Sequence, residues 1–111
     1  MITKFAPENY QETLDRVVSA FLTAPTFFQP GLGRPFTLDE IFDDMFYGVE
    51  NVKAKTRTPE KLVILEQVLT KLHEAKAALQ ANQERPGIMA LSDAKELFRS
   101  VRTAGKKRAS P

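Results

Sequence analysis

The stretch from Thr58 to Gln83 has no proline or glycine after its first turn, and this constrains the fold more than any other feature. Thr58 is a good helix-capping residue, Pro59 suits the first helical position, and Glu60 complements the positive end of the helix dipole. A helix over residues 59–83 would be about 37 Å long. Its leucines follow a 3-4-3 spacing at Leu62, Leu65, Leu69, Leu72 and Leu79. In a chain of 111 residues, such a helix forms either the spine of a bundle or the seam of a homodimer.

Two helices are predicted before this one from apolar residues at helical spacing. The first follows Pro7 and continues to about Ala24, because Pro25 ends it. The second begins at a T-x-x-E capping box formed by Thr37 and Glu40, with Phe36 and Ile41 placed as a hydrophobic staple. Within it, Gly48 costs about 1 kcal/mol relative to alanine and predicts fraying or a bend.

One more helix is predicted near the end of the sequence. Arg85-Pro86-Gly87 ends the long helix, Ser92 caps a shorter last helix, and Gly105 stops it. No strand-like period of two is present. We therefore expect an all-α fold: a compact four-helix domain over residues 1–105, followed by a basic, disordered tail at 106–111.

The segment 25–36 between the first two helices is rich in proline, glycine and phenylalanine and is predicted to be a loop. It carries more apolar surface than a solvated linker needs. Either its aromatic side chains fold over the core, or they form a contact surface for a protein partner. The candidate partner contacts are Phe27, Phe28 and Leu32.

Charge is divided along the chain. Residues 1–50 contain three basic and eight acidic side chains, a net charge of −5, whereas residues 51–111 contain thirteen basic and six acidic ones, a net charge of +7. This asymmetry is typical of a chain with an electropositive surface for an anionic partner, or of two complementary surfaces. The last helix carries a basic stripe at i, i+4, i+7 that the tail extends: Lys95, Arg99, Arg102, Lys106, Lys107 and Arg108.

That stripe has two interpretations. It could follow a nucleic-acid backbone, where affinity comes from neutralising phosphates. Alternatively, it is a solvated cation cluster at the negative end of a helix dipole. The stripe has no interleaved aromatic residue for base stacking, and the 84–91 connection is too long for a helix-turn-helix.

Catalytic chemistry has little support in the sequence. The chain has no cysteine, so disulfides and thiolate chemistry are excluded. The single histidine, His73, lies within the long predicted helix and is better explained as a helix-face residue than as a general base. A zinc site would need three or four ligands rich in His or Cys. We therefore predict no catalytic residue, no resident metal and no cofactor.

Acidic residues on the first two helices leave one enzymatic alternative open. Asp39, Glu40, Asp43 and Asp44 lie on two turns, and Glu8, Glu12 and Asp15 lie on the first helix. Carboxylates on neighbouring helices can hold Mg²⁺ or Mn²⁺. The E-x-x-D spacings at Glu12/Asp15 and Glu40/Asp43 resemble those of all-α nucleoside triphosphate pyrophosphatases, although the first motif of that family is richer in Glu. A solvated acidic face at the helix N-termini explains the same residues.

By elimination, the sequence favours a non-enzymatic interaction protein, an adaptor or regulator that binds a protein partner through helical faces and the 25–36 loop. A nucleic-acid-binding accessory protein that uses the basic C-terminal half is the first alternative, with weak binding expected. A metal-dependent nucleotide hydrolase is the second. A homodimer through the long helix is a further expectation. The longest aliphatic run has four residues, Leu62–Leu65, and no signal-peptide pattern is present, so we expect a soluble, cytoplasmic protein without a membrane partner.

Overall fold

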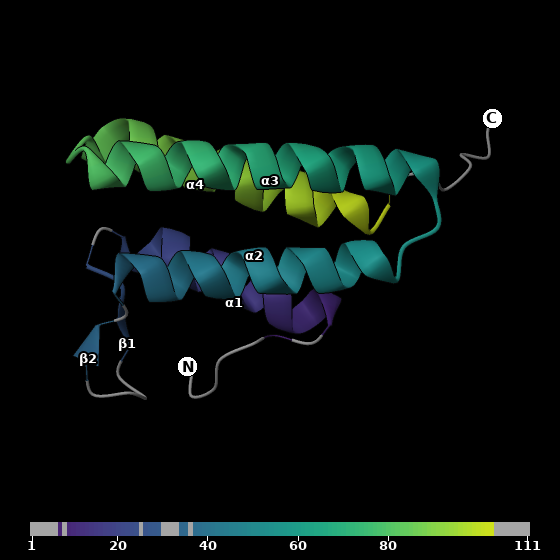
Figure 1. Cartoon of the computed structure of the whole chain (residues 1–111), viewed down its shortest axis with the longest axis horizontal. Helices are drawn as coiled ribbons and strands as arrows, with labels where there is room; N and C mark the ends of the chain where they lie inside the picture. The colour runs from purple at the N-terminus through teal and green to yellow at the C-terminus, as the bar shows by residue number, and fades with distance from the viewer. Residues whose placement is uncertain (1–6, 8, 25, 30–33, 36, 104–111) are drawn as a thin grey trace.

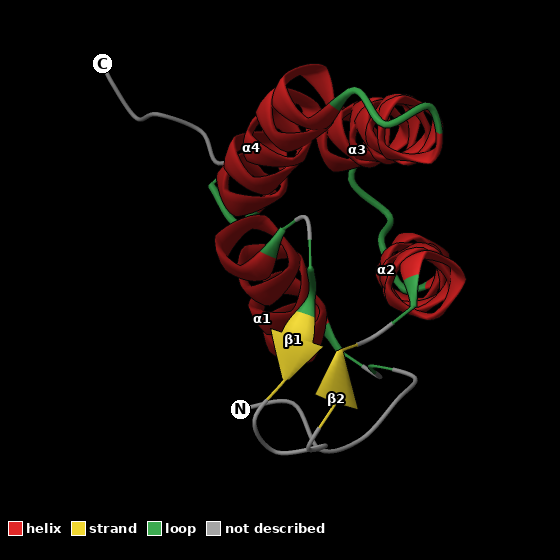
Figure 2. Ribbon diagram, turned by 90° about the vertical axis from the view of Figure 1, so that its left-hand side faces the viewer, coloured by secondary structure: helices red, strands yellow, loops and turns green. Residues whose placement is uncertain are grey.

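The computed structural model describes residues 7, 9–24, 26–29, 34–35 and 37–103. They form α1 (Tyr10–Thr23), α2 (Leu38–Ala54), α3 (Pro59–Gln80) and α4 (Glu84–Val101), with two short strands, β1 (Phe28–Gln29) and β2 (Arg34–Pro35), between α1 and α2. Each helix contacts the next along the chain, and α4 also contacts α1, so the four helices close into a bundle (Figure 1; Figure 2). The prediction of an all-α four-helix domain is confirmed.

The core lies between the four helices and consists of the apolar stripe that each one presents inward. Neighbouring helices run antiparallel (Figure 1). The largest fully buried apolar side chains come from all four helices: Val17, Ile41, Phe42, Met45, Val49, Leu65, Val68, Leu72, Leu91 and Phe98. Because these positions recur at helical spacing, the period of the sequence pattern and the buried face of each helix agree.

Capping side chains set where the first two helices begin, and a proline begins the third. Asn9 caps α1 by accepting a hydrogen bond from the backbone N–H of Glu12 at 2.8 Å, so this helix begins after Asn9 instead of directly after Pro7. The capping box of α2 is present: Thr37 Oγ1 accepts from the Glu40 N–H, and the Glu40 carboxylate accepts from the Thr37 N–H. Pro59 begins α3 as predicted, although the Thr58 side chain makes no capping hydrogen bond. Phe36, predicted as half of a staple, lies outside the described residues.

The connection between α3 and α4 corrects the prediction for the last helix. The turn occupies only residues 81–83, and Ser92 lies inside α4 rather than at its start. Asn82 has φ 61°, and the N–H of Gln83 donates to the Ala78 carbonyl at 2.8 Å, which is the 6→1 bond of a Schellman motif. Pro86 is accommodated because the first turn of a helix does not use its N–H groups. The predicted stop at Gly105 lies outside the described residues.

The early start of α4 changes how α3 is covered. Gly87, Ala90 and Ala94 of α4 are buried at i, i+3 and i+7, and small side chains let two helices approach closely. A Cβ at Gly87 would lie 2.6 Å from Cγ of Leu79, so α4 already contacts the end of α3. Leu65, Leu69 and Leu72 are buried within the chain. Leu62 and Leu79, at the two ends of the stripe, are only partly buried, and the homodimer through this helix stays a prediction.

Gly48 marks the closest approach of α1 and α2. A Cβ built there would lie 2.5 Å from Thr13 Oγ1 and 2.8 Å from Pro7 Cγ. Glycine at this position therefore allows α1 to pack closely against α2. The predicted bend or fraying at Gly48 is not observed. α2 continues without interruption from Leu38 to Ala54.

The loop between α1 and α2 contains one element that its composition did not predict. β1 and β2 pair antiparallel, with Phe28 opposite Pro35 and Gln29 opposite Arg34. Two-residue strands are too short to give a period-two pattern, so the sequence carried no signal for them. Figure 2 shows the pair beside the C-terminal end of α1.

Candidate interaction surface

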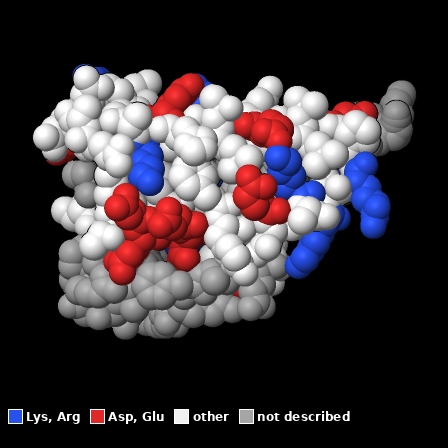
Figure 3. Space-filling view, viewed as in Figure 1, with Lys and Arg blue, Asp and Glu red and all other residues white. Residues whose placement is uncertain are grey.

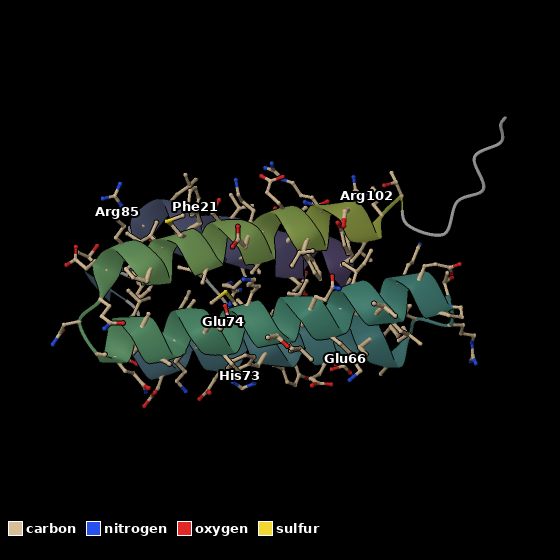
Figure 4. All side chains as sticks on the ribbon, turned by 90° about the horizontal axis from the view of Figure 1, so that it is seen from above. Phe21, Glu66, His73, Glu74, Arg85 and Arg102 are labelled. Carbon is tan, nitrogen blue, oxygen red and sulfur yellow. The ribbon has the colours of Figure 1, made fainter. Side chains whose placement is uncertain are left out.

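The basic stripe of α4 lies along its contact with α1. Arg102 donates a hydrogen bond to Oε1 of Gln11 at 3.0 Å, and its guanidinium lies 5.1 Å from the centroid of the Tyr10 ring. Lys95 Nζ lies 4.6 Å from the centroid of the Phe21 ring. Figure 4 shows Arg85, Phe21 and Arg102 along the same edge of the bundle. The structure therefore places the predicted stripe on a two-helix surface instead of on an isolated helix face.

The cations of this stripe already have partners within the chain. Glu96 approaches both Lys95 (3.1 Å) and Arg99 (3.6 Å) through Oε2. Lys95 is also largely buried, whereas the Arg99 side chain is 52% exposed. Lys106, Lys107 and Arg108 lie outside the described residues. No aromatic residue is interleaved with the stripe in the sequence, yet the rings of Tyr10 and Phe21 lie beneath two of its cations, because α1 supplies them.

Tyr10 fixes the register between α1 and α4. Its ring stacks on Phe98 with centroids 4.6 Å apart, and its hydroxyl donates to the Phe98 carbonyl oxygen at 2.7 Å. Burial raises the pKa of Tyr10, while Arg102 and Arg99 oppose that rise. The hydroxyl satisfies a carbonyl in the last turn of α4, where helix carbonyls lack intrahelical partners. Tyr10 thus holds the end of α4 that carries the cations.

Two large apolar side chains are exposed on the same pair of helices. Leu22 of α1 is 72% exposed and Met89 of α4 is 60% exposed. Because α1 and α4 are antiparallel, the C-terminal turn of α1 and the N-terminal turns of α4 lie at the same end of the bundle. Val63 of α3 and Tyr47 of α2 are the other large apolar residues exposed in the described part of the chain. Leu22 and Met89 therefore lie at the same end of the bundle, on two helices that contact each other.

Phe27 does not belong to an exposed surface. Its side chain is 2% exposed and makes an edge-to-face contact with Phe42, with ring centroids 6.3 Å apart. The prediction that Phe27 contacts a partner is therefore wrong. Burial in the core removes the apolar ring from water and so lowers the free energy of the folded state. The loop thus folds an aromatic over the core at this residue. Phe28 lies in β1, and Leu32 lies outside the described residues.

The acidic residues of α1 and α2 do not gather into one cluster. Asp44 forms an ion pair with Arg16 in the core, and Glu40 belongs to the capping box. Asp39 and Asp43 are exposed on the outer face of α2, where Figure 3 shows acidic side chains gathered. Among the described residues, no group of three or more His, Asp or Glu side chains is placed to share a metal ion. Glu8 lies outside them.

His73 has a structural environment on the α2–α3 surface. Its ring stacks on Phe46 with centroids 4.4 Å apart and lies between two interhelical ion pairs, Lys53–Glu66 and Lys76–Asp39. This agrees with its interpretation as a helix-face residue.

A shallow groove of about 430 Å³ lies between α3 and α4. Its lining is Lys71, Asp93, Glu96, Leu97 and Ser100. Lys71 bonds Glu74 at 3.2 Å and lies 3.6 Å from Asp93, so charged groups at the rim already satisfy one another. The helices that form it are antiparallel neighbours (Figure 4). Their arrangement differs from a helix-turn-helix, whose helices cross at about 90–120°. The prediction that the connection is too long for a helix-turn-helix is wrong, because the turn between α3 and α4 has only three residues.

Several residues that shape this surface were missed by sequence reasoning. Tyr10, Phe21 and Leu22 belong to the apolar stripe that recurs at helical spacing between Pro7 and Ala24, and such a stripe predicts that all three face the core. Met89 falls within the connection predicted over residues 84–91, because the cap predicted at Ser92 places the start of the last helix nine residues too late. Asn82 is the signal that would have located α4, since asparagine is one of the residues that close a helix in the left-handed conformation.

No helix in the described ranges is both long enough and apolar enough to cross a membrane. Comparison with known proteins finds no matching family model, no matching curated protein and no matching solved structure.

Proposed function

We propose that this chain is a non-enzymatic interaction protein that binds a protein partner through the α1–α4 surface. The observation that carries the proposal is the exposure of Leu22 and Met89 on two adjacent helices at one end of the bundle. Apolar side chains exposed on a folded domain become favourable contacts when a partner covers them, because burial removes their surface from water. We therefore locate the proposed contact surface on the helices instead of on the 25–36 loop, because Phe27 of that loop is buried.

Two further observations agree with a binding role. His73 stacks on Phe46 between two interhelical ion pairs, which is a structural environment for that ring. The side chain of Arg99, on the same helix as Met89, is 52% exposed, so the surface offers charged as well as apolar contacts. Such a combination, an apolar centre with a polar rim, is the usual composition of a protein–protein interface.

The test is site-specific photo-crosslinking in the native host. A benzophenone amino acid replaces Leu22 or Met89 in one set of variants, and Val63 or Tyr47 in the control set. All four positions expose a large apolar side chain, so the two sets differ only in the face they report. We expect a discrete crosslinked protein from positions 22 and 89 and none from 63 and 47. Equal crosslinking from all four, or none from 22 and 89, would overturn the proposal.

A crosslinked species of twice the chain's mass would identify a second copy of this chain as the partner, in a homodimer through the α1–α4 surface instead of through the long helix as the sequence predicts. A protein of different mass would identify a heterologous partner. Crosslinks to nucleic acid from positions 22 and 89 would favour the accessory-protein alternative instead.

A further inference from the structure

The two ends of the bundle differ in charge. The starts of α1 and α3, the ends of α2 and α4 and the 55–58 connection lie together at one end, to the right in Figure 1. The four-residue terminal turns there, with the connection and the cap of α4, hold six basic and two acidic side chains. The terminal turns at the other end hold one basic and three acidic ones. We refer to the first as the basic end, and its cations are Lys53, Lys55, Arg57, Lys61, Arg99 and Arg102.

Contacts within the described part of the chain leave much of this charge available. Arg57 and Lys61 take part in none of its ion pairs. Arg102 bonds the neutral amide of Gln11, and Arg99 is 52% exposed despite its ion pair. Figure 3 shows Lys and Arg side chains at the surface of this end. The basic end can therefore interact with an anionic partner.

Large apolar side chains are not exposed in the terminal turns of the basic end. Those exposed in the described ranges are Leu22, Tyr47, Val63 and Met89, and each lies outside these turns. A protein interface buries an apolar centre, and an amphipathic helix on a bilayer inserts apolar residues. Contact with a nucleic-acid backbone requires only that cations neutralise phosphates. The composition of the basic end therefore favours a phosphate backbone over a protein or a bilayer.

Two features favour a duplex over a single strand. The Tyr10 ring at this end stacks on Phe98 and lies beneath Arg102, so it is not open for stacking on a base. A duplex carries one charge per about 1.7 Å of its axis, twice the density of a single strand. The bundle is 27 × 21 Å across, which corresponds to about six to eight phosphate steps along one strand. Several phosphates therefore fit against the basic end at once.

From these observations we infer that the basic end binds the phosphate backbone of a double-stranded nucleic acid, independently of its sequence. Arg57 and Lys61 contact the backbone from the connection and the start of α3. Arg99 and Arg102 contact it from the end of α4. The basic residues at 106–108 follow α4 in the sequence and add to the charge that the same duplex meets. This inference goes beyond the proposed function, which rests on two side chains at the other end of the bundle.

The experiment measures the binding of a mixed-sequence duplex of about 20 base pairs by fluorescence anisotropy between 50 and 200 mM salt. We expect the logarithm of the affinity to fall against the logarithm of salt with a slope of about −4 or steeper, since each phosphate contact contributes about 0.9. Arg57→Gln and Arg99→Gln should each make the slope less steep by about 0.9, and the double variant by about twice that.

The matched control is Arg85→Gln, which removes an exposed arginine from the other end and should leave the slope unchanged. Arg57→Lys keeps the charge and should also keep the slope, so a loss in Arg57→Gln reports charge and not altered folding. Circular dichroism checks that each variant keeps its helical content. A second duplex of unrelated sequence should bind equally well, and a single strand of the same length should bind more weakly.

Anionic phosphatidylglycerol vesicles and polyglutamate are titrated in parallel, and both should bind more weakly than the duplex. Tighter binding of either would overturn the inference, as would the absence of duplex binding at 50 mM salt. Equal changes of slope in Arg57→Gln and Arg85→Gln would also overturn it, because total charge and not the basic end would then determine binding. Selective binding of one of the two duplex sequences would contradict a contact made through the backbone alone.

Discussion

Asp44 of α2 forms an ion pair with Arg16 of α1 inside the core, where the two side chains are 8% and 5% exposed. Burial lowers the pKa of Arg16, while the nearby carboxylates of Glu12 and Asp15 oppose that change. A buried pair is costly to separate, because removing one partner leaves an uncompensated charge away from water. The pair therefore specifies how α1 and α2 face each other.

Asp44→Asn should lower the free energy of unfolding by about 3–5 kcal/mol, since it leaves the Arg16 guanidinium buried without its carboxylate. Denaturant unfolding followed by circular dichroism measures the change. Asp43→Asn, the exposed neighbour, is the control and should shift stability by no more than about 0.5 kcal/mol. Replacing both partners with Arg16→Met/Asp44→Leu should recover most of the loss. A similar small effect for both single variants would contradict the buried-pair interpretation.

Gly48→Ala should destabilise the chain by about 1–2 kcal/mol, because crowding between α1 and α2 outweighs the gain in helix propensity. The new Cβ would meet Thr13, so Thr13→Ala in the same background should restore part of the stability. Thermal melting of the single and double variants checks this. A stabilising Gly48→Ala would show that the two helices are not in close contact there.

The turn between α3 and α4 predicts opposite effects for two substitutions at Asn82. Asn82→Gly should leave stability unchanged or raise it, because glycine adopts the left-handed conformation freely. Asn82→Ala should cost about 1–2 kcal/mol, the penalty for placing a Cβ in that conformation. Chemical denaturation distinguishes them, with the exposed Gln80→Ala as a control inside α3. Equal effects of Gly and Ala would contradict the Schellman geometry.

The pKa of Tyr10 should lie above the ordinary value of about 10, because burial disfavours the phenolate. A folded-state pKa that is raised stabilises the fold below the unfolded pKa, and this contribution is lost as pH rises through the folded pKa. An absorbance titration of Tyr47→Phe, in which Tyr10 is the only tyrosine, measures it. Tyr10→Phe should remove this alkaline contribution and cost about 1 kcal/mol for the lost hydrogen bond. A pKa at or below 10 would contradict the burial.

Millimolar Mg²⁺ or Mn²⁺ should leave the melting temperature unchanged if the acids of α1 and α2 serve only capping, pairing and solvation. A site that binds the folded state alone would add about 2.7 kcal/mol at a hundredfold excess over its dissociation constant. Asp39→Asn/Asp43→Asn is the appropriate variant, since Asp44 pairs with Arg16 in the core and its substitution would change the melting temperature by itself. A metal-dependent rise in melting temperature that this variant abolishes would favour the hydrolase alternative.

The cations on the α4 half of the candidate surface could be predicted from the sequence, because Lys95, Arg99 and Arg102 are related by helical spacing alone, whereas Met89 could not. The α1 half could not. Nothing in the sequence says that Gln11 lies beside Arg102, or that Leu22 stays exposed while Val17 is buried. Both facts depend on which side of α1 faces α4, and that choice is made by packing across more than eighty residues of chain.

Local patterns in the sequence by themselves determined the four helices, the capping box of Thr37 and Glu40, and the start of α3 at Pro59. Each is settled by residues within a few positions of one another, through hydrogen bonds and dihedral preferences that act locally. Tertiary structure alone decided that Arg16 and Asp44 pair in the core, that Gly48 makes room for α1, and that Phe27 is buried. These contacts join residues from different elements, so their free energy exists only once the helices have packed together.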